Sequence, residues 1–375
     1  MVMLNIESTD YCNAKCFYCI NGIQSMPHPY RGGFLPLNSH DRIFQDLDTF
    51  LNDFICMPAV DNNIYLRYCG VGEPLLHPRF IDMIKKGLSS SKVKILAILS
   101  NGTGWNRQFI DEFVSVATAA RDTHIELVFS LDTLNERTYF KIKKIKNIGG
   151  IVKNLLYLLD QIVAYNLLNV HPVFQLIVLE ENLSEAVEFC DFWVTVLNKR
   201  KLSWKIVSDP TYTKYFSESN SFVWFKCRDT DPSIQEQYRK LHASALKLVG
   251  LNTAEEKNEI AKGVHKQETR CNGQSECAKF KHVCSIMWYG INVAASGDVS
   301  PCCIDTRFNL KIGNVKHDSL QEMYRNETMR RLRTAHLEEN FESFPLCQGC
   351  PFPAYGLPVW DEDVVRYLTT IHQVK

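Results

Sequence analysis

The sequence predicts an α/β fold in which a parallel sheet or open barrel of about six strand-and-helix units precedes a small domain marked by cysteines. Two observations carry this prediction. Short apolar runs alternate with amphipathic helical stretches over the first 208 residues, and polar or glycine-rich motifs come directly after successive runs. The chain of 375 residues, 45% of them hydrophobic, is long enough to bury a sizeable core.

Five runs of apolar and β-branched residues are typical of strands buried in a parallel sheet. A sixth run, at residues 203–208, is weaker. The helical patterns between the runs include one that Ser39 could cap. Regular alternation of strand and helix favours a parallel α/β sheet or an open barrel. The five stronger runs lie at residues 3–8, 63–68, 92–99, 124–131 and 173–179.

The alternation stops near residue 208, and the chain then changes character twice. Residues 1–208 are predicted to form the α/β domain. Residues 209–283, rich in Tyr, Ser, Glu, Lys and Gln, are predicted to be an insertion or linker that is partly helical. Residues 284–350 are predicted to form a short domain marked by cysteines, and residues 351–375 a helical tail.

The charge balance excludes several classes of partner. Lys and Arg together number 42, as do Asp and Glu, so no overall field favours DNA, RNA or an anionic membrane. The lysine-rich residues 141–147 are interpreted as a solvated face. The N-terminus lacks a signal-peptide pattern, and no apolar run reaches membrane-spanning length. We therefore expect a cytoplasmic protein, in which fourteen cysteines point to metal or redox chemistry.

Three of these cysteines form a compact array after the first predicted strand. Cys12, Cys16 and Cys19 have the spacing C-x₃-C-x₂-C. A 4Fe-4S cluster is normally held by four thiolates, so three ligands leave one iron open for something else. A zinc loop and buried structural thiols are the alternatives. Zinc sites usually have four ligands, and no further Cys or His closely follows Cys19; three thiols within eight residues are hard to explain as core packing.

The array, with Tyr18 just before its last cysteine, resembles the signature of radical S-adenosylmethionine (SAM) enzymes. The resemblance implies a partial (β/α)₆ radical SAM barrel with an auxiliary-cluster domain at its C-terminus. It also implies a 4Fe-4S cluster on Cys12, Cys16 and Cys19 whose open iron chelates the amino and carboxylate groups of SAM. In this family, reductive cleavage of SAM yields a 5′-deoxyadenosyl radical, which abstracts a hydrogen atom from the substrate.

A glycine-rich motif follows the second predicted strand. The sequence GVGEP at residues 70–74 resembles the family's glycine-glycine-glutamate element, which receives the SAM amino group. The resemblance implies cofactor-binding roles for Gly70, Gly72 and Glu73, and a carboxylate suits an ammonium group as a charge-assisted acceptor. The motif departs from the family pattern at Val71, which puts the local backbone geometry in doubt.

Polar residues also follow the third and fourth predicted strands. Ser100, Asn101, Ser130 and Asp132 resemble positions that contact the methionyl carboxylate and the ribose hydroxyls of SAM. Each has an alternative explanation. Ser-Asn-Gly is also an ordinary turn, and Asp132 could cap the helix predicted to begin near Asn135.

A second set of cysteines marks the C-terminal domain. Twelve residues separate Cys284 from Gly297, four separate Gly297 from Cys302, and Cys347 and Cys350 form a later pair. This layout resembles the auxiliary-cluster motif of SPASM and twitch domains, and it implies one 4Fe-4S cluster on these four cysteines, in the shorter twitch form. The stretch around Gly297 also predicts a β-hairpin with SGD as its turn, which would bring the first two cysteines together. A four-cysteine zinc site is the alternative.

Seven cysteines remain outside these two sets. Cys303 could replace its neighbour as the cluster ligand. A further cluster could involve Cys227, Cys271 and Cys277. The others are most simply buried thiols, and they are Cys56, Cys69 and Cys190.

The resemblance implies a radical SAM oxidoreductase whose auxiliary cluster accepts an electron. Twitch enzymes that oxidise an alcohol on an aminocyclitol are similar in cysteine layout and share a Gly-Glu-Pro-Leu-Leu element like residues 72–76. We therefore expect dehydrogenation of a small polar substrate such as a sugar or aminocyclitol. The motifs identify no catalytic base.

Three other functions stay open. An epimerase would need a hydrogen-atom donor, for which Cys69 is one candidate. A peptide-modifying enzyme is less favoured, because the cluster loop begins at Cys12 and leaves no room for the N-terminal recognition domain often fused to such enzymes. A non-catalytic iron-sulfur or zinc protein is the third. The expected partners are a small-molecule or peptide substrate and an electron donor such as flavodoxin or ferredoxin, with neither nucleic acid nor membrane.

Overall fold

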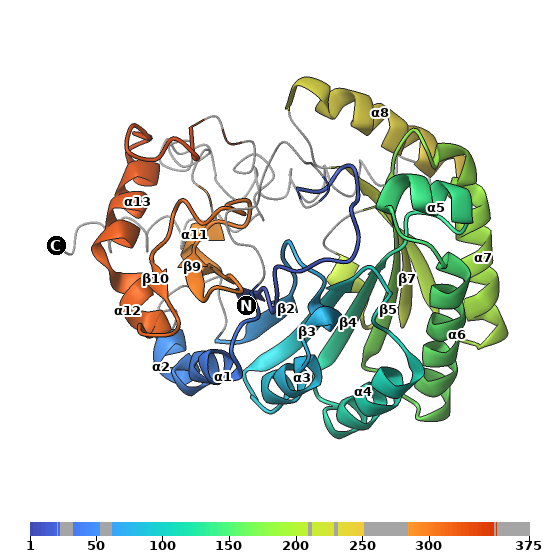
Figure 1. The fold of residues 1–375 in the computed structure, drawn as a ribbon, viewed down its shortest axis with the longest axis horizontal. Helices are drawn as coiled ribbons and strands as arrows, with labels where there is room; N and C mark the ends of the chain where they lie inside the picture. Colours follow the sequence, from blue (N-terminus) through green and yellow to red (C-terminus); the bar gives the residue numbers. More distant parts are fainter. Residues whose placement is uncertain are drawn as a thin grey trace, which may run out of the picture. The chain divides into compact units, whose positions relative to one another are not determined.

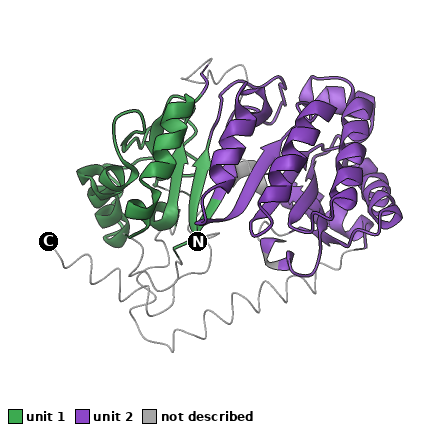
Figure 2. Cartoon of the chain, turned by 90° about the horizontal axis from the view of Figure 1, so that it is seen from below, with its two compact units in different colours: residues 1–6, 35–65, 254–375 green, residues 7–34, 66–253 purple. Residues whose placement is uncertain are grey.

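The structure is a computed structural model in which the chain divides into two compact units (Figure 2). Unit 1 comprises residues 1–6, 35–65 and 254–375, and unit 2 comprises residues 7–34 and 66–253. Each unit combines segments that are distant in sequence. The described residues are 1–20, 22, 33–52, 62–208, 212–228, 232–250, 284, 286–348 and 350.

Some predictions fall beyond these ranges. The helical tail at residues 351–375 and the cysteines at positions 56, 271 and 277 lie outside the described residues. The domain boundaries near residues 208, 283 and 350 stay predictions.

Unit 2 contains a sheet of parallel strands, which confirms the predicted α/β class (Figure 1). The strand β2 (Ile64–Tyr68) crosses the boundary between the two units. The parallel strands of unit 2, in the order in which they pair, are β3 (Val93–Ser100), β4 (His124–Ser130), β5 (Val170–Val178), β7 (Ser221–Cys227) and β6 (Trp204–Val207).

Strand β7 corrects the prediction that strands end near residue 208. It lies within the predicted insertion and pairs with both β5 and β6. Its sequence, SFVWFKC, is rich in the aromatic and β-branched residues that favour strands, and its first five residues are buried. The signal was therefore present in the sequence, although polar neighbouring segments surround it.

The helices of unit 2 cover one face of this sheet (Figure 1). Trp105 packs edge-on against Phe129 of β4 and Phe113 of α4, and Phe174 of β5 stacks on Trp193 of α7. Because successive strand residues point to opposite faces, the strand residues next to Phe129 and Phe174 face away from the helices. The helices are α3 (Phe80–Leu88), α4 (Arg107–Ala119), α5 (Glu136–Lys143), α6 (Ile148–Ala164), α7 (Ala186–Lys199) and α8 (Pro232–Leu248), with 3₁₀ turns η2 (Pro74–Leu76), η3 (Leu183–Glu185) and η4 (Tyr212–Tyr215).

The predicted cap at Ser39 is wrong, and so is the alternative explanation of Asp132 as a helix cap. Helix α1 (Leu37–Gln45) begins after Pro36, so Ser39 lies inside the helix and is buried. The cap of α5 is Asn135, whose side chain accepts hydrogen bonds from the backbone N–H groups of the following turn, and not Asp132.

Unit 1 contains the predicted β-hairpin. Strand β8 (Gly290–Val293) pairs in parallel with β1 (Val2–Ile6) and antiparallel with β9 (Asp298–Ser300), which pairs with β10 (Gly313–Asn314). The hairpin turn requires glycine, because Gly297 has φ +89° and a Cβ there would lie 2.7 Å from Asn314 Oδ1. The helices of this unit are α1, α2 (Leu47–Leu51), α11 (Ile286–Tyr289), α12 (Leu320–Arg325) and α13 (Glu327–Leu337).

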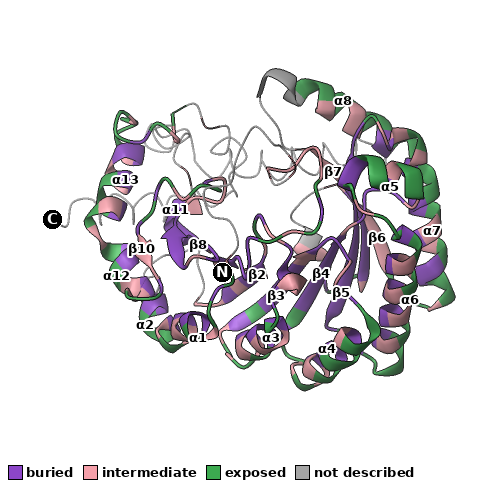
Figure 3. Ribbon diagram, viewed as in Figure 1, coloured by how far each residue is buried: buried purple, intermediate pink, exposed green. Residues whose placement is uncertain are grey.

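Both units have buried apolar cores (Figure 3). Within the described ranges, no helix has the length and hydropathy needed to cross a membrane.

Candidate functional site

The three-cysteine array lies on a loop of unit 2 that packs against the end of helix α5. The N–H of Lys15 donates to the carbonyl of Lys143 at 2.8 Å, and the N–H of Phe17 donates to the carbonyl of Ile142 at 3.2 Å. These bonds alternate along the loop with Cys16, so α5 fixes the backbone on both sides of that cysteine.

The three thiols are partly exposed and influence one another's charge. Burial raises the pKa of Cys12 to about 11, and the nearby Glu73 and the other two thiols raise it further, against a lowering hydrogen bond from Ala14. Burial also raises the pKa of Cys16, whereas the Lys143 ammonium lowers it. The thiolate forms of Cys12 and Cys16 are therefore disfavoured unless positive charge is added beside them.

The glycine-rich motif after β2 approaches the cluster loop closely. A Cβ at Gly72 would lie 1.9 Å from the carbonyl oxygen of Thr9, so this approach requires glycine. The next residue, Glu73, donates its N–H to the carbonyl of Tyr11 at 2.7 Å. The motif and the start of the cluster loop thus lie side by side in unit 2.

The departure at Val71 leaves the backbone of the motif anchored. The N–H of Val71 donates to Glu7 Oε1 at 2.7 Å. Gly70, with φ +152°, lies against the same Glu7 side chain. Glu7 is buried at the end of the first strand, and the sequence analysis did not single it out.

The Glu73 carboxylate is buried and held by the end of β3. Its Oε1 accepts a hydrogen bond from Ser100 Oγ, and its Oε2 accepts one from the N–H of Asn101, each at 2.7 Å. Burial raises the pKa of Glu73 to about 7, although these hydrogen bonds and the Lys143 charge lower it. Among the described residues, no Lys or Arg forms an ion pair with this carboxylate.

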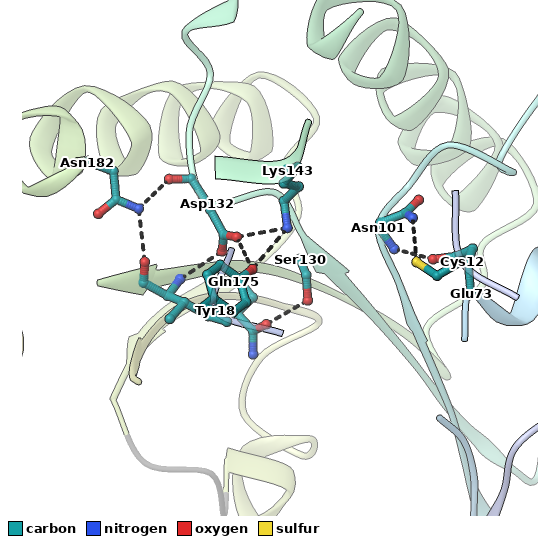
Figure 4. A network of polar contacts seen from close by, with 10 residues as sticks. Cys12, Tyr18, Glu73, Asn101, Ser130, Asp132, Lys143, Gln175 and Asn182 are labelled. Carbon is teal, nitrogen blue, oxygen red and sulfur yellow. Dashed lines mark hydrogen bonds and ion pairs between the residues drawn. The ribbon is translucent and has the colours of Figure 1, made fainter. Parts of the chain in front are cut away.

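Asn101 joins the motif to the cluster loop. Its Nδ2 lies 4.0 Å from Cys12 Sγ (Figure 4). The same nitrogen donates to Asn13 Oδ1 at 2.8 Å. Its Oδ1 accepts a hydrogen bond from the N–H of Thr103 at 3.0 Å. The structure therefore brings Cys12, Glu73, Ser100 and Asn101 together, as the sequence predicts.

The residues after β4 are arranged differently. Ser130 Oγ donates to Gln175 Oε1 at 2.7 Å, on the face of the sheet opposite the helices. Asp132 is fully buried and accepts hydrogen bonds from three groups, namely Tyr18, Lys143 and the N–H of Ile177 (Figure 4). Its carboxylate is thus committed to the protein interior, whereas contact of Ser130 with ribose stays a prediction.

The second cysteine set converges in unit 1. Cys284, Cys302, Cys347 and Cys350 line one pocket, whose remaining wall is almost wholly apolar. The predicted hairpin therefore does bring Cys284 and Cys302 to one place. The other lining residues are Ile286, Met287, Pro301, Cys303, Ile304, Leu310, Leu332, His336 and Leu346.

The thiols in this pocket are strongly disfavoured as free thiolates. Burial raises the pKa of Cys302 and that of Cys347 to about 12 each, with further contributions from neighbouring thiols. Burial also raises the pKa of Cys284, and N–H groups of the short helix α11 lower it. Cys303 lines the same pocket, so the choice of Cys302 over Cys303 as the ligand stays a prediction.

The sequence did not predict one polar residue of this pocket, His336. His336 of α13 is buried, and its Nδ1 accepts the N–H of Cys284 at 3.3 Å. Burial lowers the pKa of His336 to about 4, so the ring is neutral near pH 7. Its position in an amphipathic helix gave no signal that distinguishes it from a core histidine.

Comparison with known proteins agrees with this geometry. Residues 284–351 match the model of the SPASM iron-sulfur cluster-binding domain. The chain is 25% identical over 193 residues to a GTP 3′,8-cyclase of Desulforamulus reducens, covering 50% of each chain. It is 26% identical over 152 residues to a GTP 3′,8-cyclase of Synechocystis sp., covering 40% of each. The chain thus resembles radical SAM enzymes, and its residues 284–351 match a SPASM-type domain.

The fold of this chain is also that of a solved structure. Streptococcus suis SuiB bound to the precursor peptide SuiA superimposes with a TM-score of 0.52 at 14% identity, covering 88% of this chain and 65% of SuiB. The chain spans about half the length of the first curated relative and less than two thirds of SuiB. The cofactors of this family with a SPASM domain are SAM, a 4Fe-4S cluster and auxiliary iron-sulfur clusters.

The residues present fit these cofactors. Glu73 offers a buried carboxylate without an ion-pair partner among the described residues, which suits the N–H donors of the SAM amino group. The pocket of unit 1 offers five thiols in an apolar setting, and a fully ligated iron-sulfur cluster needs four. Over the described ranges, no three or more His, Cys, Asp or Glu side chains converge closely enough to hold a single metal ion.

Proposed function

We propose that this radical SAM enzyme is a dehydrogenase that oxidises an alcohol carbon of a small polar substrate, such as a sugar or an aminocyclitol. The pocket with four cysteines carries the proposal. A cluster with a protein thiolate on every iron has no open iron for SAM, and it is suited to accept an electron. In this proposal Cys284, Cys302, Cys347 and Cys350 hold that auxiliary cluster.

Cys12, Cys16 and Cys19 hold the SAM cluster in this proposal. When bound, the SAM cluster supplies the electron that cleaves SAM to methionine and a 5′-deoxyadenosyl radical. The auxiliary cluster supplies an acceptor for a later electron. The alcohol becomes a carbonyl when its carbon gives a hydrogen atom to the 5′-deoxyadenosyl radical, its hydroxyl oxygen loses a proton, and one electron passes to the auxiliary cluster. An electron donor such as flavodoxin or ferredoxin, and a reducing cytoplasmic setting, belong to the same proposal.

The protein supplies binding and orientation for this chemistry. Glu73 accepts hydrogen bonds from the SAM amino group, and Ser100 and Asn101 hold the Glu73 carboxylate in place through its two oxygens. Gly72 lets the backbone of the motif reach the start of the cluster loop, and Gly70 lies against the Glu7 side chain. The chain thereby orients SAM with few residues of its own.

A polar substrate is favoured by the polar side chains toward the carboxyl ends of β4 and β5, on the face of the sheet opposite the helices. Ser130 pairs in register with Gln175, and its hydroxyl donates to Gln175 Oε1 at 2.7 Å. These residues alternate with the aromatics that contact the helices. Such a face suits a ligand rich in hydroxyl or amino groups better than a lipid.

A deuterium-transfer experiment tests the proposal. The reconstituted, reduced enzyme is incubated with SAM and a panel of sugars and aminocyclitols deuterated at the carbinol carbon. A substrate should give deuterated 5′-deoxyadenosine and a carbonyl product in equal amounts. The double variant Cys347→Ala, Cys350→Ala should still transfer deuterium but give no carbonyl product. Carbonyl formation by that double variant at the wild-type rate would refute the role of the auxiliary cluster.

Epimerisation is the second candidate, and Cys69 is the observation that favours it. Cys69 follows Tyr68, whose ring packs toward α3, so Cys69 points to the opposite face. Burial raises the pKa of this thiol, which keeps it protonated near pH 7 as a hydrogen-atom donor needs to be. An epimerase would incorporate solvent deuterium into its product, and Cys69→Ala would abolish this incorporation.

The likeness to SuiB concerns the fold. A synthetic peptide is therefore included in the same panel to test a peptide substrate. Deuterium transfer from a peptide, with none from any polar small molecule, would replace the proposed substrate class.

A further inference from the structure

A buried ion pair lies directly behind the cluster loop. Lys143 Nζ lies 2.8 Å from Asp132 Oδ2, and their side chains are 2% and 0% exposed. The Tyr18 hydroxyl donates to the same carboxylate oxygen at 2.5 Å and accepts from Lys143 Nζ at 3.3 Å. These three side chains form a closed triangle of polar contacts (Figure 4).

Such a triangle needs a reason beyond stability. The free energy needed to remove two charges from water offsets much of their mutual attraction. A buried ion pair is therefore often no more stabilising than apolar residues of similar size. Buried charged networks are better explained where they fix one arrangement of the chain. The members here come from three separate segments, since Tyr18 lies on the cluster loop, Asp132 follows β4, and Lys143 ends α5.

One side of the triangle is fixed to the sheet. Asp132 Oδ1 accepts the N–H of Ile177 in β5 at 2.9 Å, and its backbone carbonyl accepts Asn182 Nδ2 at 2.8 Å. The backbone of Asp132 has φ +67°, a conformation that Asp tolerates better than most residues. These contacts hold the carboxylate in one position.

The other members of the triangle hold the cluster loop at two points. The carbonyl of Lys143 accepts the N–H of Lys15, and Asp132 accepts the hydroxyl of Tyr18. Cys16 therefore lies between held residues, and Cys19 directly follows Tyr18. The Lys143 charge also acts on the Cys16 thiol.

We infer that Tyr18, Asp132 and Lys143 form a clamp that holds the cluster loop in its binding geometry before iron arrives. The three are positioning residues, and none is required to touch SAM or substrate. The inference rests on the assignment of Cys12, Cys16 and Cys19 to the SAM cluster, and is independent of which substrate is oxidised. Without the clamp, the loop has to be ordered by the cluster itself, which weakens the site.

The Tyr18→Phe variant tests the clamp with little disturbance. It removes one hydroxyl and leaves the Lys143–Asp132 pair intact. Tyr139→Phe is a matched control, because Tyr139 is a fully buried tyrosine of α5 whose hydroxyl has no hydrogen-bond partner among the described residues. Both variants are reconstituted anaerobically as full chains, and iron loss to a chelator is followed together with the SAM-dependent change in the electron paramagnetic resonance spectrum.

The clamp predicts that Tyr18→Phe loses the SAM-responsive cluster about tenfold faster than wild type, the scale of one hydrogen bond to a charged group. The auxiliary cluster should be lost at the wild-type rate, and Tyr139→Phe should match wild type for both clusters. Equal rates for Tyr18→Phe and Tyr139→Phe would overturn the clamp. If wild type never gains a SAM-responsive signal, the proposed function fails instead, so the two failures are distinguishable.

Lys143 variants separate the clamp from a simple requirement for folding. Lys143→Met leaves Asp132 buried without its counter-charge, so it can unfold the unit. The double variant Lys143→Met, Asp132→Asn removes both charges and is compared with Lys143→Arg, which retains the cation. The clamp predicts fast cluster loss in a folded double variant and at least partial rescue by Lys143→Arg. A folded double variant with wild-type cluster retention would contradict the clamp.

Discussion

Replacement of Glu73 by Gln tests the role of this carboxylate in binding SAM. The variant keeps the size of the side chain and removes its charge. A hydrogen bond to a charged group contributes about 1.5–3 kcal/mol, so Glu73→Gln should weaken SAM binding by roughly 10- to 150-fold at pH 8. Isothermal titration calorimetry of the anaerobically reconstituted protein measures this change.

The pH dependence sharpens the test. Because burial raises the pKa of Glu73 to about 7, the carboxylate is mostly protonated at pH 6 and mostly ionised at pH 8. The affinity of wild type for SAM should therefore rise about tenfold from pH 6 to pH 8, following the ionised fraction. At pH 7, binding should release about half a proton, which shows as a dependence of the binding enthalpy on the buffer.

The raised pKa of Glu73 also affects the stability of the folded protein. A carboxyl whose folded-state pKa lies above its unfolded value of 4.5 lowers the free energy of unfolding as pH rises from about 4.5 to 7. The cost for this group is about 3 kcal/mol above pH 7, and Glu73→Gln removes it. A variant that binds SAM as tightly as wild type, with the same pH slope and the same proton release, would refute the role of Glu73.

Three further substitutions address other parts of the site. Gly72→Ala should abolish SAM binding while leaving the auxiliary cluster intact, because its Cβ would lie 1.9 Å from the Thr9 carbonyl oxygen; SAM titration and iron analysis test this. Gly297→Ala should lower the free energy of unfolding of the metal-free protein by about 1–2 kcal/mol, since an L residue at φ +89° is strained, and chemical denaturation measures it. Cys302→Ser should remove about four irons per chain and Cys303→Ser none, so equal iron content in the two variants would contradict the choice of Cys302.

Much of the fold could be predicted from the sequence because its strands are long apolar runs and its motifs follow them. The hairpin at Gly297 was also predictable, since few residues other than glycine allow such a turn. Strand β7 was missed because the segments beside it are polar, and its place between β5 and β6 depends on pairing that local pattern does not encode. The start of α1 was misplaced because Pro36 ends the preceding segment earlier than the capping pattern suggested.

The site was predictable in part for a similar reason. Glu73, Ser100 and Asn101 meet because each follows a strand, and the order of motifs along the chain gives that information. Lys143 could not be singled out, because a lysine in a lysine-rich helix end is usually solvated. The prediction of a solvated face is wrong for this one residue, whose burial results from Asp132 and Tyr18 on two distant segments.

Cleavage of SAM is the most direct measurement of radical SAM activity in this chain. Reduced, reconstituted wild type is incubated with SAM, and 5′-deoxyadenosine and methionine are quantified, with Cys16→Ala as the control. We predict that wild type forms both products in equal amounts and that the Cys16→Ala variant forms neither. Wild-type protein that carries its full iron content and yields no 5′-deoxyadenosine would contradict the proposed function.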